Sequence, residues 1–378
     1  MATTASPDGA ADRELRTGLI DLTRALVQVP SSAAHPSAIE RALELLRARL
    51  QPVDGVRIDE HRCEGVPSLV VTPAAVDTPS ILLVGHIDVV DHGTRRHYRS
   101  RVRDGRIYGP GAGDMKGAVA IMVTLFADLV RRFPEAALGL AITADEERGS
   151  QHGTRYLIDQ GLSCDLAILP DGGSIDTVVV AEKGLLHVEV LWRGASAHGA
   201  YPWTGNNPVD SMLSDLAKIR DRFSALATDR TDHWHPTATI TTLESESKSV
   251  NRVPEFARAG VDVRFTPPWT VATMLREVQS CLSPGAELSL PNVTECTTMA
   301  VDADYRAISE QVLGTPLQEM RTPGASDARF FSALGVPAIL SRPEVGNVHR
   351  VDEWVDINSM LLYHRILHTF IHRRLHLS

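Results

Sequence analysis

The sequence lacks the features that mark membrane, nucleic-acid-binding and disulfide-rich proteins. No segment approaches the roughly 20 consecutive apolar residues of a membrane-spanning helix. The formal net charge is -9 and no long run of Lys or Arg occurs, so we expect neither a nucleic acid nor a membrane as partner. No Cys-x-x-Cys pair is present, which predicts reduced thiols in a cytoplasmic protein, without a disulfide framework or a thiolate zinc site. The scattered cysteines are Cys63, Cys164, Cys281 and Cys296.

The composition that remains is typical of a globular protein with two domains. Of the 378 residues, 43% are hydrophobic and 22% are charged, and the length exceeds that of most single domains. Residues 1–12 are rich in Ala, Thr and Asp, with neither a basic start nor an apolar stretch. They predict a disordered leader rather than a signal peptide.

Short apolar runs predict the sheet of the first domain. Residues 81–84, 138–143 and 166–169 have the length and composition of buried strands in an α/β fold. Apolar residues at helical spacing predict helices over 15–29, 37–50 (capped by Ser37) and 118–130. We therefore expect a catalytic domain with a mostly parallel sheet flanked by helices, formed by residues 13–183 and 294–378.

Residues 184–293 follow a different pattern. Alternating strands and helical segments occur there in the order β-α-β-β-α-β. This order is that of the split βαβ, or ferredoxin-like, sandwich. The sequence therefore predicts an inserted α+β domain.

Acidic residues and histidines follow the carboxyl ends of the predicted strands. The first strand leads into His86 and Asp88, the second into Glu146 and Glu147, and the third into Asp171. Ligand sites in α/β sheets gather at the edge where the carboxyl ends of parallel strands meet. We therefore expect these side chains to converge, with Asp88 fixing the orientation of the His86 ring.

Two further candidates lie on loops. Asp114 belongs to the glycine-rich stretch 105–117, which lacks the Gly-Lys-Ser/Thr ending of a phosphate-binding loop. It precedes an apolar helix, so a simple N-cap is the alternative. The three adjacent acids 145–147 also have an alternative, a solvated surface loop. His349 lies on the loop 346–353 near the C-terminus.

Nitrogen and carboxylate ligands without thiolates suit zinc, cobalt or manganese. Five such ligands are too many for one tetrahedral zinc with an open position, and they fit two metals that share a bridging carboxylate. Glu146 would then be free to act as a general base.

These residues and their neighbours resemble the M20 family of metallopeptidases and deacylases, from about Leu22 to Leu367. The matching motifs are Gly-His-Ile-Asp-Val-Val, Gly-Asp-Met-Lys-Gly, Thr-Ala-Asp-Glu-Glu, the Asp of Leu-Pro-Asp-Gly-Gly, Val-His-Arg-Val-Asp-Glu, and Ala-His-Gly-Ala-Tyr-Pro-Trp-Thr-Gly-Asn-Asn-Pro. The resemblance implies two zinc ions per chain, with cobalt or manganese as alternatives. It implies that His86 and Asp171 hold one ion, that Glu147 and His349 hold the other, and that Asp114, followed by a cis peptide bond, bridges them.

The resemblance also implies catalytic and substrate-binding roles. Glu146 would activate the metal-bound water and pass its proton to the leaving nitrogen, while Asp88 orients His86. His198, in the inserted domain, would stabilise the oxyanion from the partner subunit of a homodimer. The residues matched to substrate-binding positions are Arg264, Asn251, Gly324 and Ser326.

We therefore expect a hydrolase that cleaves the amide bond of an N-acyl amino acid with a free carboxylate, the inserted domain serving as lid and dimerisation domain. The alternatives are a dipeptidase or carboxypeptidase with the same centre, or a non-catalytic binding protein. Taken alone, His198 also fits an ordinary surface histidine, and Arg264 a charge at a strand edge. A stripe of histidines at helical spacing near the C-terminus predicts a solvated or packing face: His364, His368, His372 and His376.

Overall fold

The computed structural model describes residues 7–227 and 233–377, which divide into two units. The first unit draws on Met1–Val180, Met299–Met320 and Ser326–Ser378, and the second on Ala181–Thr298 and Arg321–Ala325. The second unit is slightly wider than the predicted insertion. Thr297 and Thr298 pair with Glu182 and Ala181. The residues just before and just after the predicted insertion therefore belong to the second unit.

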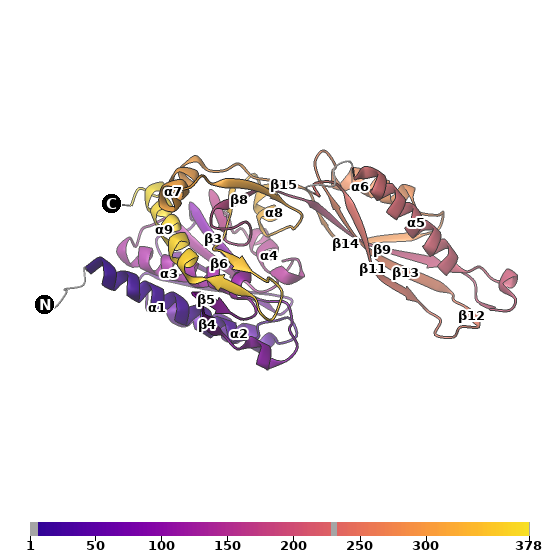
Figure 1. Ribbon diagram of the computed structural model, residues 1–378, viewed down its shortest axis with the longest axis horizontal. Coiled ribbons are helices and arrows are strands. Elements are labelled where there is room, and N and C mark those ends of the chain that lie inside the picture. Colours follow the sequence, from indigo (N-terminus) through magenta and orange to yellow (C-terminus); the bar gives the residue numbers. More distant parts are fainter. Residues whose placement is uncertain (1–6, 228–232, 378) are drawn as a thin grey trace. The chain divides into compact units, whose positions relative to one another are not determined.

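A six-stranded sheet, in the order β1-β2-β6-β3-β7-β17, forms the centre of the first unit (Figure 1). The neighbours β6, β3, β7 and β17 run parallel, whereas β1 and β2 are antiparallel. The mostly parallel sheet is therefore confirmed. The strands are β1 (Val56–Cys63), β2 (Val66–Pro73), β3 (Ile81–His86), β6 (Leu138–Thr143), β7 (Leu166–Leu169) and β17 (Ala338–Leu340).

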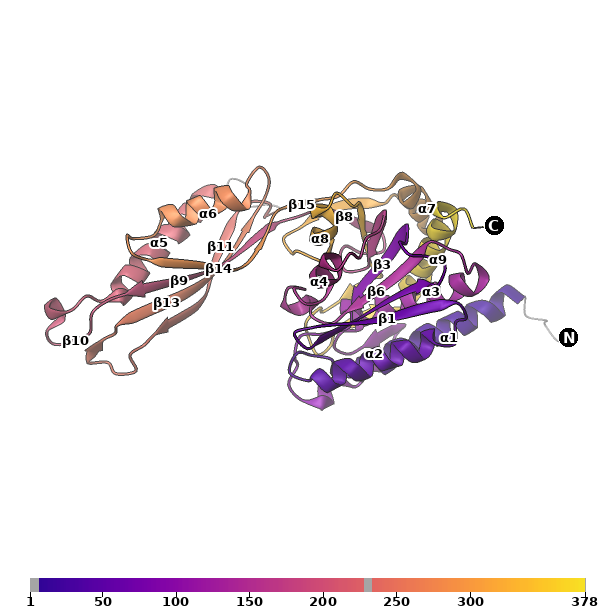
Figure 2. The same ribbon diagram turned by 180° about the vertical axis from the view of Figure 1, so that it is seen from behind.

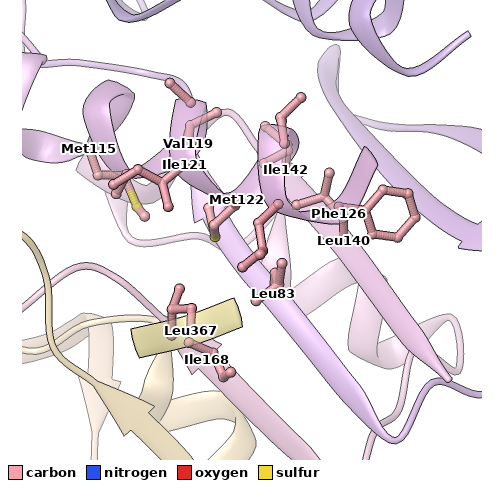
Figure 3. Close-up of a cluster of buried hydrophobic side chains, with 14 of the residues drawn as sticks. Leu83, Met115, Val119, Ile121, Met122, Phe126, Leu140, Ile142, Ile168 and Leu367 are labelled. Carbon is pink, nitrogen blue, oxygen red and sulfur yellow. The ribbon is translucent and has the colours of Figure 1, made fainter. Parts of the chain in front are cut away.

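Alternate residues of the central strands face opposite helical layers, as the two-residue repeat of a strand requires. Leu83, Leu140 and Ile168 face the layer that contains Met122 of α3 (Figure 3). Leu82 and the other residues that alternate with these along the strands face the smaller layer on the other side of the sheet. The first layer contains α1 (Pro7–Val27), α2 (Pro36–Leu50), α3 (Gly117–Arg132), α7 (Ala303–Leu313) and α9 (Ile357–Arg374), and the second contains α4 (Thr154–Asp159) and α8 (Ala328–Ala333).

Two helix starts differ from the prediction because proline begins each helix. The predicted leader ran to residue 12, but α1 begins at Pro7; residues 1–6 of the leader lie outside the described residues. Helix α2 begins at Pro36 with His35 as its N-cap, so the prediction that Ser37 caps it is wrong. Proline suits the first helical position, since its φ is already helical and its missing N–H would have no partner there.

Short elements complete the first unit. Residues 91–104 contain the 3-10 turn η1 (Arg95–Tyr98) and the strand β4 (Arg101–Arg103). A small sheet has the order β18-β19-β5-β4. The other short elements here are β5 (Arg106–Tyr108), η2 (Ala112–Lys116), η3 (Glu146–Arg148), β18 (Val345–Gly346) and β19 (Trp354–Asp356). The strands β8 (Thr177–Glu182) and β16 (Gln318–Thr322) span the boundaries between the units.

The second unit is an antiparallel sheet covered on one face by two helices (Figure 2). Its strand order is β11-β13-β9-β14, and its chain order is the predicted β-α-β-β-α-β. Leu186, Val188 and Val190 of β9 alternate with more exposed residues and pack in the core beneath the helices. The elements are β9 (Gly184–Arg193), β10 (Ala197–His198), η4 (Pro202–Thr204), α5 (Pro208–Leu226), β11 (Thr237–Ser245), β12 (Arg252–Val253), β13 (Phe256–Phe265), α6 (Val271–Ser280), β14 (Glu287–Thr294) and β15 (Thr297–Thr298).

Within the described ranges, no helix has both the length and the apolar character that crossing a membrane requires. All four cysteines of the sequence are free thiols, as predicted.

Candidate metal centre

The candidate site lies where the parallel strands of the first unit end. Strand β3 ends at His86, β6 is followed by η3 with Glu146 and Glu147, and β7 is followed by Asp171. Because β6, β3 and β7 are parallel neighbours, their carboxyl ends share one edge of the sheet.

Two groups of side chains meet at this edge. In each group the possible ligand atoms lie within 4.8 Å of one another. The first group is His86, Glu146 and Asp171, and the second is Asp114, Glu147 and His349. The structure thus brings together the five residues predicted as ligands and the predicted base.

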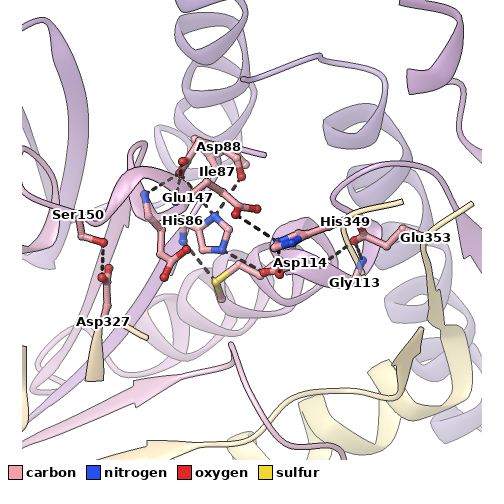
Figure 4. Close-up of polar contacts among 12 residues, drawn as sticks. His86, Ile87, Asp88, Gly113, Asp114, Glu147, Ser150, Asp327, His349 and Glu353 are labelled. Atoms are coloured by element: carbon pink, nitrogen blue, oxygen red, sulfur yellow. Dashed lines mark hydrogen bonds and ion pairs between the residues drawn. The ribbon is translucent and has the colours of Figure 1, made fainter. Parts of the chain in front are cut away.

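His86 is buried, and its two ring nitrogens face different partners. Its Nδ1 lies 3.0 Å from the main-chain oxygen of Asp88, and its Nε2 lies 3.2 Å from Oδ1 of Asp114 (Figure 4). A carbonyl oxygen only accepts hydrogen bonds, so Nδ1 carries the proton. Nε2 in turn donates a hydrogen bond to the Asp114 carboxylate, and a cation bound between the two would take the place of that proton.

The carboxylate of Asp88 has a role that the sequence did not reveal. Its Oδ1 accepts a hydrogen bond from the main-chain N–H of Glu146 at 3.2 Å, and its Oδ2 accepts one from Glu147 at 3.1 Å. The same carboxylate lies 3.5 Å from the His86 ring. Asp88 therefore fixes His86 mainly through its carbonyl oxygen, and fixes the turn after β6 through its carboxylate.

Asp114 connects the two groups. The peptide bond between Asp114 and Met115 is cis, as the family resemblance implied. Oδ1 of Asp114 faces His86, while Oδ2 lies 3.4 Å from Nε2 of His349. That nitrogen also lies 3.2 Å from Oε2 of Glu147. Hydrogen bonds to Asp114 and Glu147 raise the pKa of His349 to about 10.

The carboxyl groups of the centre carry strongly shifted pKa values. Burial, followed by the charge of Asp171, raises the pKa of Glu146 well above its usual range. Burial and the charge of Asp114 do the same to the pKa of Asp171. Burial also opposes ionisation of Asp114, but hydrogen bonds from His349 and His86 outweigh it and hold its pKa well below the usual range.

The donor set fits divalent cations. Several partly buried carboxylates share few positive charges, and the Oε1 atom of Glu147 is buried without a hydrogen-bond partner. Imidazole nitrogens and carboxylate oxygens, without sulfur, are ligands for zinc, cobalt or manganese. His86 and Asp171 would hold one cation, Glu147 and His349 would hold the other, and Asp114 would contribute to both.

Two charged residues near the centre were absent from the sequence prediction. Glu353 is buried, and burial raises its pKa to about 7, although the main-chain N–H of Asp114 donates to it. Arg342 lies two residues after β17, and its charge lowers the pKa of Asp114 and opposes the rise at Asp171. The strand-end rule could have identified Arg342, because β17 lies parallel to β7.

The second unit contains three predicted residues. His198 is exposed at the end of β10, and its Nδ1 accepts a hydrogen bond from the N–H of Ala200 at 3.0 Å. In the neutral ring Nε2 therefore carries the proton and is a donor. Asn251 lies beside it, since its carbonyl oxygen accepts from the N–H of Gly199. Arg264, on β13, donates to Asp262 through Nε at 2.7 Å and Nη2 at 3.0 Å.

The segment 324–326 spans the boundary between the units. Gly324 is exposed in the second unit, and its N–H donates to the hydroxyl of Thr322. Ser326 is buried in the first unit, and its hydroxyl accepts from the N–H of Ala328 at 3.2 Å. The structure therefore assigns these two predicted pocket residues to different units.

Comparison with known proteins identifies the family. The model for peptidase family M20/M25/M40 matches residues 82–373, which include every proposed metal ligand. The chain belongs to this family. As an M20 member, with desuccinylases among its relatives, it is a metal-dependent hydrolase.

Individual relatives and structures support this M20 assignment. The chain is 31% identical over 321 residues to the succinyl-diaminopimelate desuccinylase of Anaplasma marginale (strain Florida), covering 78% of this chain and 81% of the relative. The fold is similar to that of aminopeptidase PepT from Bacillus cereus ATCC 10987, with a TM-score of 0.75, 19% identity, and coverage of 94% of this chain and 98% of that one. The M20 metallo-carboxypeptidase Sso-CP2 from Sulfolobus solfataricus gives a TM-score of 0.74, 17% identity, and coverage of 95% and 98%.

Proposed function

We propose that this M20 protein is a di-metal hydrolase that cleaves the amide bond of an N-acyl amino acid. The observation that carries the proposal is the pair of ligand groups at one sheet edge, with the carboxylate of Glu146 beside them. The similarity to succinyl-diaminopimelate desuccinylases favours a deacylase over other hydrolases with such a centre.

In the proposed mechanism, two zinc ions, or cobalt or manganese in their place, would polarise the scissile carbonyl and lower the pKa of water at the centre. Glu146 takes a proton from the attacking water and then donates it to the leaving nitrogen. The burial that raises the pKa of Glu146 makes its carboxylate a better proton acceptor for this task. Asp88 holds the backbone of Glu146 in place during both transfers.

The second unit would supply the remaining groups. The Nε2 proton of His198 would stabilise the developing oxyanion, from the partner subunit of a homodimer. Arg264 and Asn251 would bind the free carboxylate of the substrate, since a guanidinium pairs with a carboxylate through two parallel hydrogen bonds. The main chain at Gly324 and Ser326 would line the substrate-binding pocket.

A dipeptidase or carboxypeptidase is the second candidate. The solved structures with a similar fold include a tripeptidase from Staphylococcus aureus and the carboxypeptidase Sso-CP2. Peptide hydrolysis would use the same centre and the same base, and would differ in the group on the acyl side of the bond.

The test is hydrolysis of N-acetyl amino acids, N-succinyl amino acids and dipeptides by metal-loaded protein, with a chelator control. We expect one preferred class, with turnover lost on chelation. Glu146→Gln should abolish turnover while two metals stay bound per chain, whereas Glu135→Gln, at an exposed glutamate, should match the wild type. Turnover that survives in Glu146→Gln would contradict the assignment of the base.

A further inference from the structure

One buried glutamate links the two loops that carry Asp114 and His349. Glu353 is 1% exposed. Its Oε1 accepts hydrogen bonds from the main-chain N–H groups of Gly113 at 2.7 Å and Asp114 at 2.8 Å (Figure 4). A single carboxylate oxygen therefore holds the backbone that presents the Asp114 carboxylate.

The main chain of Glu353 adds two further contacts. Its carbonyl oxygen accepts from the N–H of Gly109 at 2.8 Å, at the start of the same glycine-rich loop. Its N–H donates to the carbonyl oxygen of Arg350 at 3.1 Å, which closes the turn that follows His349. Glu353 thus ends the turn that carries one proposed ligand and holds the loop that carries another.

The loop has little room to move around this anchor. A Cβ on Gly113 would lie 2.8 Å from the Cβ of Val345 and 3.1 Å from the carbonyl oxygen of Trp354. The residue at this position must therefore be glycine, or its neighbours must shift. Loss of the anchoring carboxylate would leave the N–H groups of Gly113 and Asp114 without their acceptor.

A buried lysine lies near this carboxylate. Lys116 is fully buried, and its Nζ donates to the carbonyl oxygen of Val29 at 2.8 Å. Burial lowers the pKa of Lys116 to about 7, and the charges of Glu353 and Asp88 oppose this shift. The two main-chain N–H groups that donate to Glu353 make its carboxylate a structural anchor, and neither group of possible metal ligands includes it.

We propose that Glu353 is a positioning residue that keeps the Asp114 carboxylate and the His349 imidazole at the separation that one shared cation requires. This inference rests on the proposed di-metal function. It predicts that loss of the Glu353 carboxylate weakens binding of both cations, because Asp114 would contribute to each, and most strongly binding of the one that Asp114 shares with His349.

Three variants distinguish this role from general support of the fold. Glu353→Gln keeps an oxygen that accepts both N–H groups, so it should bind two cations as the wild type does. Glu353→Asp is one methylene shorter and Glu353→Ala has no acceptor, so both should bind the two cations that share Asp114 more weakly. Residues that orient metal ligands change metal affinity by about 10–100-fold when they are removed, and we expect a loss in this range. Glu344→Ala, at an exposed glutamate of the same segment, is the matched control.

The measurement is calorimetric titration of chelator-stripped protein with Zn²⁺, supported by circular dichroism of each variant. The expected result is two sites whose affinities are the same in the wild type, Glu353→Gln and Glu344→Ala, and weaker binding at both sites, with the larger loss at one of them, in Glu353→Asp and Glu353→Ala. Two sites of wild-type affinity in both damaging variants would overturn the inference while leaving the proposed function intact. If Glu353→Ala does not fold, the comparison of Glu353→Asp with Glu353→Gln decides the question. A wild type that binds no Zn²⁺ would instead refute the di-metal function.

Discussion

The buried histidine of α9 gives stability a pH dependence that the structure allows us to calculate. His364 is 8% exposed, and burial, with the charge of His368 acting in the same direction, lowers the pKa of its imidazole to about 4. An unfolded chain titrates near the ordinary value of 6.5. Because the pKa of His364 is lower in the folded protein than in the unfolded chain, protonation favours unfolding. The stability that the neutral imidazole allows is complete above pH 6.5 and is lost as the pH falls towards 4. The loss is about 2 kcal/mol at pH 5 and about 3 kcal/mol at pH 4.

The substitution His364→Leu removes the titrating group and keeps an apolar side chain of similar size. Urea denaturation of chelator-treated protein measures the free energy of unfolding. Between pH 7 and pH 4, we expect this free energy to fall by about 3 kcal/mol less in His364→Leu than in the wild type. His376→Leu changes an exposed member of the same histidine stripe and should follow the wild type. Parallel curves for the wild type and His364→Leu would refute the reasoning, because they would mean that the folded protein accepts the proton as readily as the unfolded chain.

Three further predictions concern the site. Asp88→Asn leaves one buried N–H of the η3 turn without an acceptor, so urea denaturation should show a loss of about 1–3 kcal/mol, and unchanged stability would contradict this contact. His198→Ala should lower kcat by about 10²–10³-fold with little change in KM in steady-state kinetics, whereas a change in KM alone would remove it from oxyanion stabilisation. Arg264→Lys should raise KM by about tenfold or more for substrates with a free carboxylate and leave KM for their amides unchanged; equal effects on both would argue against carboxylate binding.

The central strands could be predicted from the sequence because they are short, apolar and buried on both faces. All residues of β3, β6 and β7 are buried, and polar side chains occur only at their carboxyl ends, at His86 and Thr143. Strand β1 could not be predicted in the same way. It lies at the edge of the sheet, its residues are exposed or half-buried, and charged residues such as Arg57, Asp59 and Glu60 fill much of it. Its pairing with β2, rather than its own composition, defines it.

The residues of the candidate site also fall into those that the sequence could identify and those that it could not. The residues that follow strand ends could be identified because the sheet brings those ends together, whatever the sequence distance. Contacts made by side chains to distant backbone have no such signal. Glu353 bonds to the N–H of Asp114, 239 residues away, and the carboxylate of Asp88 bonds to amides 58 and 59 residues away. No local pattern predicts these partners, and the structure was needed to find them.

The contacts of Asp88 connect the two groups of possible ligands. Its carbonyl oxygen orients the ring of His86, while its two carboxylate oxygens hold the backbone of Glu146 and Glu147. One residue thus fixes a proposed ligand of the first cation, a proposed ligand of the second, and the proposed base between them. The backbone position of Glu146 relative to the proposed ligands is therefore set by hydrogen bonds within the protein. A proposed base held in this way is preorganised for proton transfer, and preorganised polar groups act most strongly in a reaction because they do not have to reorient.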